Sequence, residues 1–125
     1  ATLLVPDYDE AIAFYVGTLG FTLVHDTPLG PDVRWVVVAP QPGAAGLLLA
    51  RPGDAAQAAR VGDQTGGRVG FFLETDDFDG TYARWTAAGV TFCEEPRSEP
   101  FGRVVVWADP WGNRWDLIEP ATGAG

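Results

Sequence analysis

The stretch LLVPDYDEAIAFY (residues 3–15) decides the fold, because its pattern returns 70 residues later in the same chain. At this offset Asp7-Tyr8-Asp9 corresponds to Asp77-Phe78-Asp79, and Tyr15 corresponds to Trp85. Further along the offset is 69. It then links the following segments: Gly20-Phe21-Thr22-Leu23 with Gly89-Val90-Thr91-Phe92, Arg34 with Arg103, Val36-Val37 with Val105-Val106, and Leu48-Leu49 with Leu117-Ile118. A sequence repeated at a fixed offset predicts a repeated structural unit.

Each half has the same order of patterns: a short apolar strand, an Asp-containing turn, a helix that ends at a glycine, and three further strands. In the first half Asp7 or Asp9 can cap the helix, and Gly20 can end it. The expected first-half elements are a strand at Thr2–Val5, a helix running to about Gly17, and strands near Phe21–Asp26, Val33–Ala39 and Gly46–Arg51.

The second half repeats this order of elements. Its expected elements are a strand at Val69–Glu74, a helix at Asp79–Ala88, and strands at Val90–Glu95, Gly102–Ala108 and Arg114–Glu119. Between the halves, the Ala-rich segment 52–67 is bounded by glycines and predicts a linker with a turn of helix. We therefore expect one domain, 1–125, with module 1 at 1–51, the linker at 52–67 and module 2 at 68–120.

The predicted fold class is α+β, with two βαβββ modules that form an incomplete curved barrel. A four-stranded sheet with a single helix has one face covered, so its other face must meet something else. Two such faces turned inward would form a cup. Alternation along the strands assigns the following residues to the concave side: Thr2, Leu4, Trp35, Val37, Leu47, Leu49, Gly70, Phe72, Glu74, Val104, Val106, Asp116 and Ile118.

Composition excludes several classes of protein. The chain is 46% hydrophobic, with seven Phe and five Trp, which is enough for a packed core. No apolar run approaches the roughly 20 residues of a membrane span. The formal charge of −9, with only eight basic residues, all Arg, argues against nucleic acid and anionic membranes as partners. The single cysteine, Cys93, allows no internal disulfide and fits a reducing cytoplasm.

Other chemical motifs are weak. Asp76, Asp77 and Asp79 lack the spacing of a calcium-binding loop, and helix capping explains them. The only histidine, His25, has no Ser or Cys partner nearby in sequence, and we interpret it as a partly exposed residue at a strand end. The sequence contains no Gly-rich loop with a phosphate-binding Lys.

At several places the sequence resembles the vicinal-oxygen-chelate superfamily, which includes glyoxalases, bleomycin resistance proteins and dioxygenases. The resemblance covers nearly the whole chain, and the following segments carry it: LLVPDYDEAIAFY (3–15), Leu19-Gly20-Phe21, Glu74-Thr75-Asp76-Asp77-Phe78 and Asp109-Pro110-Trp111-Gly112-Asn113. It implies a cup built from paired modules and, in the enzymes, a divalent metal on the concave face.

The family's metal-ligand places are poorly filled. The place in the last strand falls on Asp116, and its partner in the repeat is Leu47, which has no donor atom. The place in the first strand of module 2 falls on Gly70, and the corresponding place in module 1 lies before Ala1. Because a catalytic metal needs about three protein ligands, we expect no metal site and no cofactor, with a divalent metal as the alternative.

The predicted cup surface is mainly apolar, which is typical of a site for an organic molecule. The candidate ligand-binding residues are Trp35, Leu47, Phe72, Glu74, Phe101, Val106, Trp111 and Asp116. Asp116 and Glu74 are costly to bury without a partner. For them the sequence favours an internal partner among Arg34, Arg68, Arg103 and Arg114, with a ligand or metal as the alternatives.

The leading hypothesis is a cytoplasmic protein that binds a small hydrophobic organic molecule, which the acidity of the chain allows to be cationic. The resemblance implies an alternative: a metal-dependent lyase, epimerase or extradiol-type dioxygenase, with Glu74 as a candidate base. Whether the chain is an enzyme is left open, as is a third reading as an interaction domain. The resemblance and the open sheet edges also predict a homodimer.

Overall fold

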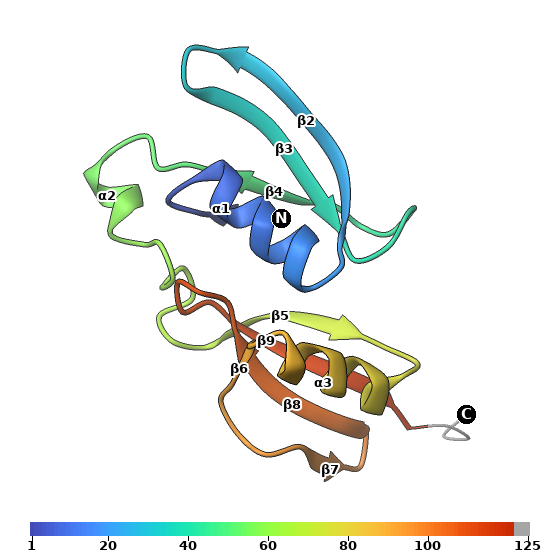
Figure 1. Cartoon of the computed structure of the whole chain (residues 1–125). Coiled ribbons are helices and arrows are strands. Elements are labelled where there is room, and N and C mark those ends of the chain that lie inside the picture. Colours follow the sequence, from blue (N-terminus) through green and yellow to red (C-terminus); the bar gives the residue numbers. More distant parts are fainter. Residues whose placement is uncertain (122–125) are drawn as a thin grey trace. The chain divides into compact units, whose positions relative to one another are not determined.

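The structure is a computed structural model that describes residues 1–121 (Figure 1). Its internal contacts divide the chain into two compact units, with the boundary between Gln64 and Thr65. The predicted end of the domain at residue 125 lies outside the described residues. Each unit is therefore considered by itself.

The first unit contains four strands, one helical segment between the first two strands, and a short helix after the last. Its elements are β1 (Thr2–Leu4), α1 (Tyr8–Ile12), the π-helical turn η1 (Ala13–Thr18), β2 (Thr22–Gly30), β3 (Val33–Ala39), β4 (Leu47–Ala50) and the short helix α2 (Ala55–Ala58). β2 is longer than the sequence predicts and extends the β2–β3 hairpin beyond the rest of the sheet (Figure 1).

The second unit repeats this plan. Its elements are β5 (Val69–Glu74), α3 (Phe78–Ala87), β6 (Thr91–Phe92), β7 (Arg97–Glu99), β8 (Gly102–Ala108) and β9 (Arg114–Pro120). The strand predicted at Val90–Glu95 is wrong in its second half. β6 stops at Phe92, and β7 resumes pairing with β8 five residues later.

Both sheets have the same topology. The order is β1-β4-β3-β2 in the first unit and β5-β9-β8-β6 in the second, with β7 also pairing with β8. The first strand of each unit is parallel to the last, and the other pairs are antiparallel. Neither sheet closes into a barrel within residues 1–121. The predicted fold class of two βαβββ modules is confirmed.

The helices of the two units begin and end in the same way. The carboxylate of Asp7 accepts from the Glu10 N–H at 2.9 Å, and that of Asp77 accepts from the Gly80 N–H at 3.1 Å. Each aspartate thus satisfies one of the free N–H groups of a first helical turn. Gly20 and Gly89 follow the helices with φ near +85°, a conformation that favours glycine.

The change of repeat offset from 70 to 69 has a structural cause. Module 1 has one residue more than module 2 between its helix and the following glycine. The extra residue is absorbed in η1, where the Leu19 N–H donates to the Phe14 carbonyl, five residues back, at 2.9 Å. A π turn accommodates an insertion without ending the helix. The single helix predicted up to Gly17 is therefore α1 continued by η1.

An arginine on a strand forms an ion pair with an aspartate at the start of α1, and another does so at the start of α3. Arg34 on β3 pairs with Asp9 at 2.9 Å and lies over the Tyr8 ring. Arg103 on β8 pairs with Asp79 at 2.6 Å and lies over the Phe78 ring at 4.4 Å. The repeat thus preserves a contact between helix and sheet as well as an order of elements.

In the first unit α1 and η1 cover one face of the sheet, and in the second unit α3 does so. The core of each unit lies between this helix and its sheet. In the second unit three tryptophans form the centre: the Trp107 ring lies 5.0 Å from that of Trp85 on α3 and 5.1 Å from that of Trp115 on β9. In the first unit the core residues are Leu3, Val5, Tyr15, Phe21, Val36, Val38 and Leu49. The face of each sheet opposite its helix is called its open face below.

The predicted position of Leu47 on the concave side is wrong, as is that of Leu49. Leu47 pairs with Val38 and Leu49 pairs with Val36, and all four are buried on the helix side. The residue between them, Leu48, pairs with Val37 and is the counterpart of Asp116, which pairs with Val106. The loop before β4 contains one residue more than its counterpart before β9, which reverses the alternation.

Most of the segment predicted as a linker, residues 52–64 of 52–67, belongs to the first unit. Asp54 caps α2 by accepting from the Gln57 N–H at 2.8 Å. The side-chain amide of Gln64 accepts from the Leu4 N–H and donates to the Thr2 carbonyl at 3.1 Å. Gln64 therefore occupies backbone groups at the outer edge of β1. Across the described chain no helix is long and apolar enough to span a membrane.

Candidate functional site

The second open face is set by the alternation along β5, β8 and β9. Phe71 stacks on Trp115 on the helix side at 4.6 Å, so its neighbour Phe72 points to the other side and is 67% exposed. We define the second open face by Phe72, Glu74, Val104, Val106, Asp116 and Ile118. Four of these are predicted site residues: Phe72, Glu74, Val106 and Asp116.

These side chains form two rows across the strands. In the first row Phe72 lies opposite Asp116, which lies opposite Val106. In the second row Glu74, Ile118, Val104 and Arg97 follow one another across four strands. Residues paired in register share a face of the sheet and lie near one another. Of these residues Val104 is fully buried, so the others supply the accessible surface. The face therefore has an apolar centre, with charged groups at both ends of the second row.

Asp116 is the least satisfied polar group on this face. Its Oδ1 atom is fully buried and has no hydrogen-bond partner among residues 1–121. Burial raises the pKa of this carboxyl group above its usual range, with Arg97 opposing and Glu94 reinforcing the shift. A partly buried carboxylate without a donor destabilises the fold, so Asp116 is suited to receive a donor from outside the chain.

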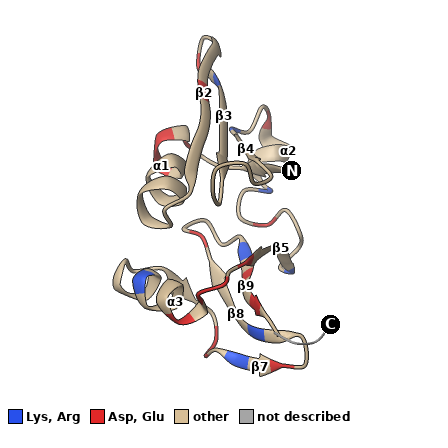
Figure 2. Ribbon diagram, turned by 90° about the vertical axis from the view of Figure 1, so that its right-hand side faces the viewer, with Lys and Arg blue, Asp and Glu red and all other residues tan. Residues whose placement is uncertain are grey.

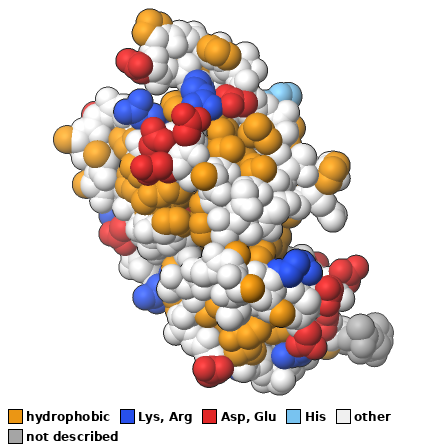
Figure 3. Space-filling model, in the orientation of Figure 1, with side chains coloured by type: hydrophobic (Ala, Val, Ile, Leu, Met, Phe, Trp, Pro, Cys, Tyr) orange, Lys and Arg blue, Asp and Glu red, His pale blue; other side chains and the backbone are white. Residues whose placement is uncertain are grey.

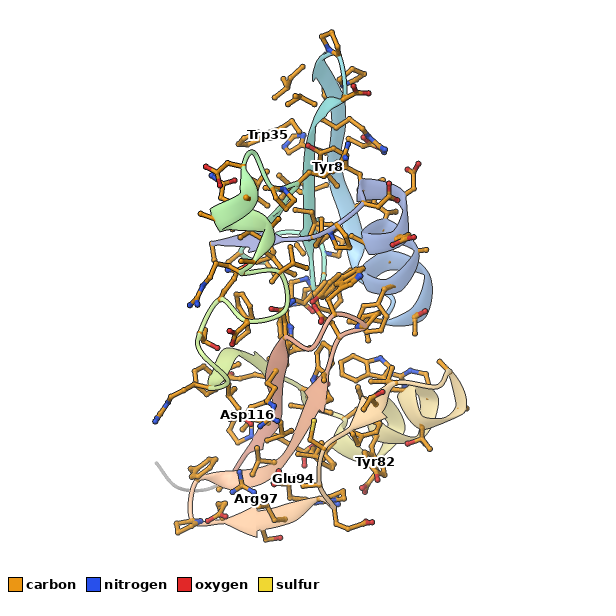
Figure 4. All side chains as sticks on the ribbon, turned by 90° about the vertical axis from the view of Figure 1, so that its left-hand side faces the viewer. Tyr8, Trp35, Tyr82, Glu94, Arg97 and Asp116 are labelled. Carbon is orange, nitrogen blue, oxygen red and sulfur yellow. The ribbon has the colours of Figure 1, made fainter. Side chains whose placement is uncertain are left out.

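Glu94 and Arg97 are residues that the sequence prediction missed. The Glu94 carboxylate accepts from the Val106 N–H at 3.0 Å, in the gap between β6 and β7 where strand pairing is interrupted. Arg97 donates to Glu94 at 3.2 Å and to Glu99 at 2.5 Å. Figure 4 shows Glu94, Arg97 and Asp116 in the same region of the second unit. A signal was present in Pro96, which cannot donate a ladder hydrogen bond and so indicates a break in the strand.

The predicted arginine partners of Asp116 and Glu74 are wrong. Arg34 pairs with Asp9 and Asp26, and Arg103 pairs with Asp79. The ion pair with Arg34 lowers the pKa of Asp26. Within the described residues, neither Asp116 nor Glu74 forms an ion pair with any arginine. The basic side chain whose charge acts on Asp116 is Arg97 instead.

The open face of the first unit is different in character. It carries Trp35, which is 45% exposed, together with Val37 and Leu48. His25 pairs with Val37 and is exposed within β2, not at a strand end. Trp35 lies on β3 (Figure 4). This face offers an aromatic ring but no carboxylate at the place that corresponds to Asp116.

The two remaining predicted aromatics lie in turns of the second unit. Phe101 is 53% exposed in the β7–β8 turn. Trp111 is half-buried in the turn before β9, which is organised by the buried Asp109. The Asp109 carboxylate accepts from the Trp111 N–H at 3.1 Å and from the Asn113 N–H at 2.8 Å. Neither aromatic is part of the second open face as defined above.

The donor set on this face does not fit a catalytic metal. Gly70 on β5, the counterpart of a family ligand place, has no donor atom in its side chain, and Asp116 faces Phe72 and Val106 in its row. Residues 1–121 contain no group of three or more His, Cys, Asp or Glu side chains placed to hold an ion. The chemistry available on this face is hydrogen bonding, ion pairing and stacking.

The unmet carboxylate makes a prediction about stability. Replacing Asp116 by Leu, the residue type at its counterpart Leu48, is expected to raise the free energy of unfolding at pH 7 by about 1–2 kcal/mol. Because the folded protein holds the Asp116 proton more tightly than the unfolded chain, this gain should shrink as the pH falls from 7 toward about 4 and should be lost below that pH. Urea unfolding of both proteins at several pH values measures it.

The matched control is Asp76→Leu, which removes an exposed carboxylate outside the second open face. It should produce no comparable gain at neutral pH. A loss of stability in Asp116→Leu at pH 7 would show that the carboxylate has a stabilising partner within the chain.

Comparison with known proteins places these features in context. Residues 1–117 match the model of the Glyoxalase/Bleomycin resistance protein/Dioxygenase superfamily. An uncharacterized protein of Shewanella frigidimarina is 48% identical over 120 residues, which is 94% of this chain and 88% of the relative. The similarity therefore extends through both units.

Two solved structures are similar in fold and sequence. UcmS2 is 31% identical, with a TM-score of 0.78, and the alignment covers 94% of this chain and 95% of that one. TnmS3, an antibiotic-binding protein from Streptomyces sp. CB03234, is 34% identical, with a TM-score of 0.73 and coverage of 96% and 93%. Both are similar to this chain along nearly its whole length.

Proposed function

Because the chain belongs to the glyoxalase/bleomycin resistance protein/dioxygenase superfamily, we propose that it binds and sequesters a small, mainly hydrophobic organic molecule without chemically changing it. The observation that carries this proposal is the second open face, where the exposed Phe72 ring lies in register with the unpartnered carboxylate of Asp116. An apolar surface with a few polar groups is typical of sites that bind organic ligands.

One similar solved structure supports a binding role over catalysis. TnmS3 is described as an antibiotic-binding protein, and it resembles this chain in both sequence and fold. We propose testing antibiotics first, and among them those with a planar aromatic ring, which can stack on the exposed Phe72. The rival function, a metal-dependent lyase, epimerase or dioxygenase, would need metal ligands that the second open face does not supply. In keeping with the single cysteine, we propose that the protein acts in the cytoplasm.

Phe72 should contribute most of the apolar contact with the ligand. Replacing Phe72 by Ala is expected to weaken the binding of an aromatic ligand by about tenfold to a hundredfold, since a stacked ring contributes about 1–3 kcal/mol. Isothermal titration with a panel of polycyclic antibiotics and dyes measures the effect. Because Phe72 is 67% exposed, the variant should keep the melting temperature of the wild type.

Phe101→Ala is the matched control, because Phe101 is also an exposed Phe of the second unit but lies in the β7–β8 turn, outside the strands that define this face. It should bind like the wild type. Equal losses in both variants would contradict a site on the second open face. A bound metal at one ion per chain, found by elemental analysis and lost in Asp116→Ala, would favour the enzyme rival.

We further propose that the chain forms a homodimer. The β2–β3 hairpin exposes large apolar side chains, among them Leu29 at 61% and Val33 at 49%. Figure 3 shows hydrophobic side chains at the surface of its tip. Exposed apolar patches of this kind often mark interfaces between chains. Light scattering should give twice the chain mass at micromolar concentration, and a monomer at every concentration would contradict the proposal.

A further inference from the structure

Phe72 and Asp116 form a two-part surface on adjacent strands. They lie directly opposite each other in the parallel β5–β9 pair and share a face. Neighbouring strands are about 4.8 Å apart. A substituent on an aromatic ring that stacks on Phe72 can therefore reach the Asp116 carboxylate. Stacking and polar recognition would then occur in a single ligand.

The Asp116 carboxylate needs a donor that the described chain does not provide. Its Oδ1 atom is buried and unpartnered within residues 1–121, but Asp116 as a whole is only half-buried, so a ligand on this face can reach the side chain. A hydrogen bond from a charged donor to a carboxylate is roughly twice as strong as one between neutral groups. A donor that also carries positive charge would offset the cost of burying this group most fully.

Neither of the two arginines near Asp116, Arg97 and Arg114, forms an ion pair with it. Arg97 is held by both Glu94 and Glu99 and forms no ion pair with Asp116, although its charge still acts on that carboxyl group. Arg114 is on β9, two residues before Asp116, and is exposed. Among the described ion pairs, none joins Arg114 to Asp116. An external cation therefore meets little competition for this carboxylate.

The surface around Asp116 carries a net negative charge, like Asp116 itself. Four carboxylates lie on or beside the second open face, in Glu74, Glu94, Glu99 and Asp116, against the two guanidinium groups of Arg97 and Arg114. The balance is four negative charges less two positive ones, or −2. Figure 2 shows acidic and basic residues along β7 and β9. A cation is attracted to such a surface and an anion is repelled.

Building on the function proposed above, we propose that Phe72 and Asp116 together select aromatic ligands that carry a protonated nitrogen next to the ring, such as an amidine, guanidine or amine. The ring stacks on Phe72, where a cation also interacts favourably with the face of the phenyl group. The protonated nitrogen donates to Asp116. Glu94 and Glu99 act as positioning residues, because they hold Arg97 in ion pairs of their own.

Three probes of nearly identical shape test this selection: 2-naphthamidine, 2-naphthamide and 2-naphthoate, which are cationic, neutral and anionic at pH 7. Isothermal titration into the full chain should give binding about tenfold tighter for the amidine than for the amide, with the naphthoate weakest. Asp116→Asn should remove the amidine preference while changing amide binding less than about threefold. Arg114→Gln, which removes a like charge from the same strand, should strengthen amidine binding.

The matched control is Asp76→Asn, which also removes one negative charge, but at an exposed site outside this face. It should leave all three affinities unchanged. Equal affinities for amide and amidine that both fall in Phe72→Ala would overturn the charge selection but keep the proposed binding function. An amidine preference that survives in Asp116→Asn would also overturn it. Failure of all three probes and of the larger polycyclic panel would overturn both proposals.

Discussion

Replacing Trp107 by Ala is expected to lower the free energy of unfolding by about 3–5 kcal/mol. Trp107 is fully buried and lies against Trp85 on α3 and Trp115 on β9, so it joins the helix to the sheet of the second unit. The alanine variant leaves a cavity between them. Domains of this size are stable by only about 5–15 kcal/mol, so the variant should be close to unfolding at 37 °C.

Urea unfolding followed by circular dichroism measures this loss. Trp35→Ala is the matched control, because Trp35 is 45% exposed and its removal should cost much less. Trp107→Phe, which keeps an aromatic ring between the two neighbouring tryptophans, should retain part of the stability. If Trp107→Ala cost no more than Trp35→Ala, the packing described for the second unit would be wrong.

The second large effect is expected at the turn before β9. Asp109 is buried, and its carboxylate accepts from the N–H groups of Trp111 and Asn113 and from the Asn113 side-chain amide at 2.7 Å. Asp109→Ala would leave these donors without their acceptor. Because hydrogen bonds to a buried charged group are costly to break, we expect a loss of about 3–5 kcal/mol.

Asp109→Asn separates the roles of the two carboxylate oxygens. Its amide oxygen can still accept from the backbone N–H groups, but its amide nitrogen would face the Asn113 side chain with two donors and no acceptor. In thermal unfolding the stability of Asp109→Asn is therefore expected to lie between those of the wild type and Asp109→Ala. Equal stability of all three proteins would show that the turn does not depend on this carboxylate.

The architecture could be predicted because the two halves of the sequence match each other at a nearly constant offset. The matched segments at Asp7-Tyr8-Asp9 and Asp77-Phe78-Asp79 fixed both helix starts, and the structure gives the two units the same strand order. The repeat also made Arg34 and Arg103 equivalent positions. The ion pair that each forms with an aspartate of a helix could not be predicted from spacing alone. That contact depends on side-chain geometry across the sheet.

The errors arise where one residue changes the register. The extra residue before β4 placed Leu47 on the wrong face, since a shift of one reverses the alternation of a strand. The break between β6 and β7 was not predicted: Glu94 fell inside the strand expected at Val90–Glu95, and Arg97 fell in the loop expected after it, although it begins β7. The partners of Asp116 were mispredicted for a different reason, because an arginine is excluded as a partner only when its own contacts are known.

The central claim is that the second open face holds the ligand, and amide chemical-shift mapping by NMR tests it most directly. On titration with a polycyclic aromatic antibiotic that binds the protein, the account predicts the largest shifts on the strands that carry this face, at Phe72, Val106 and Asp116. Shifts confined to α3, on the covered side of the same sheet, would contradict it.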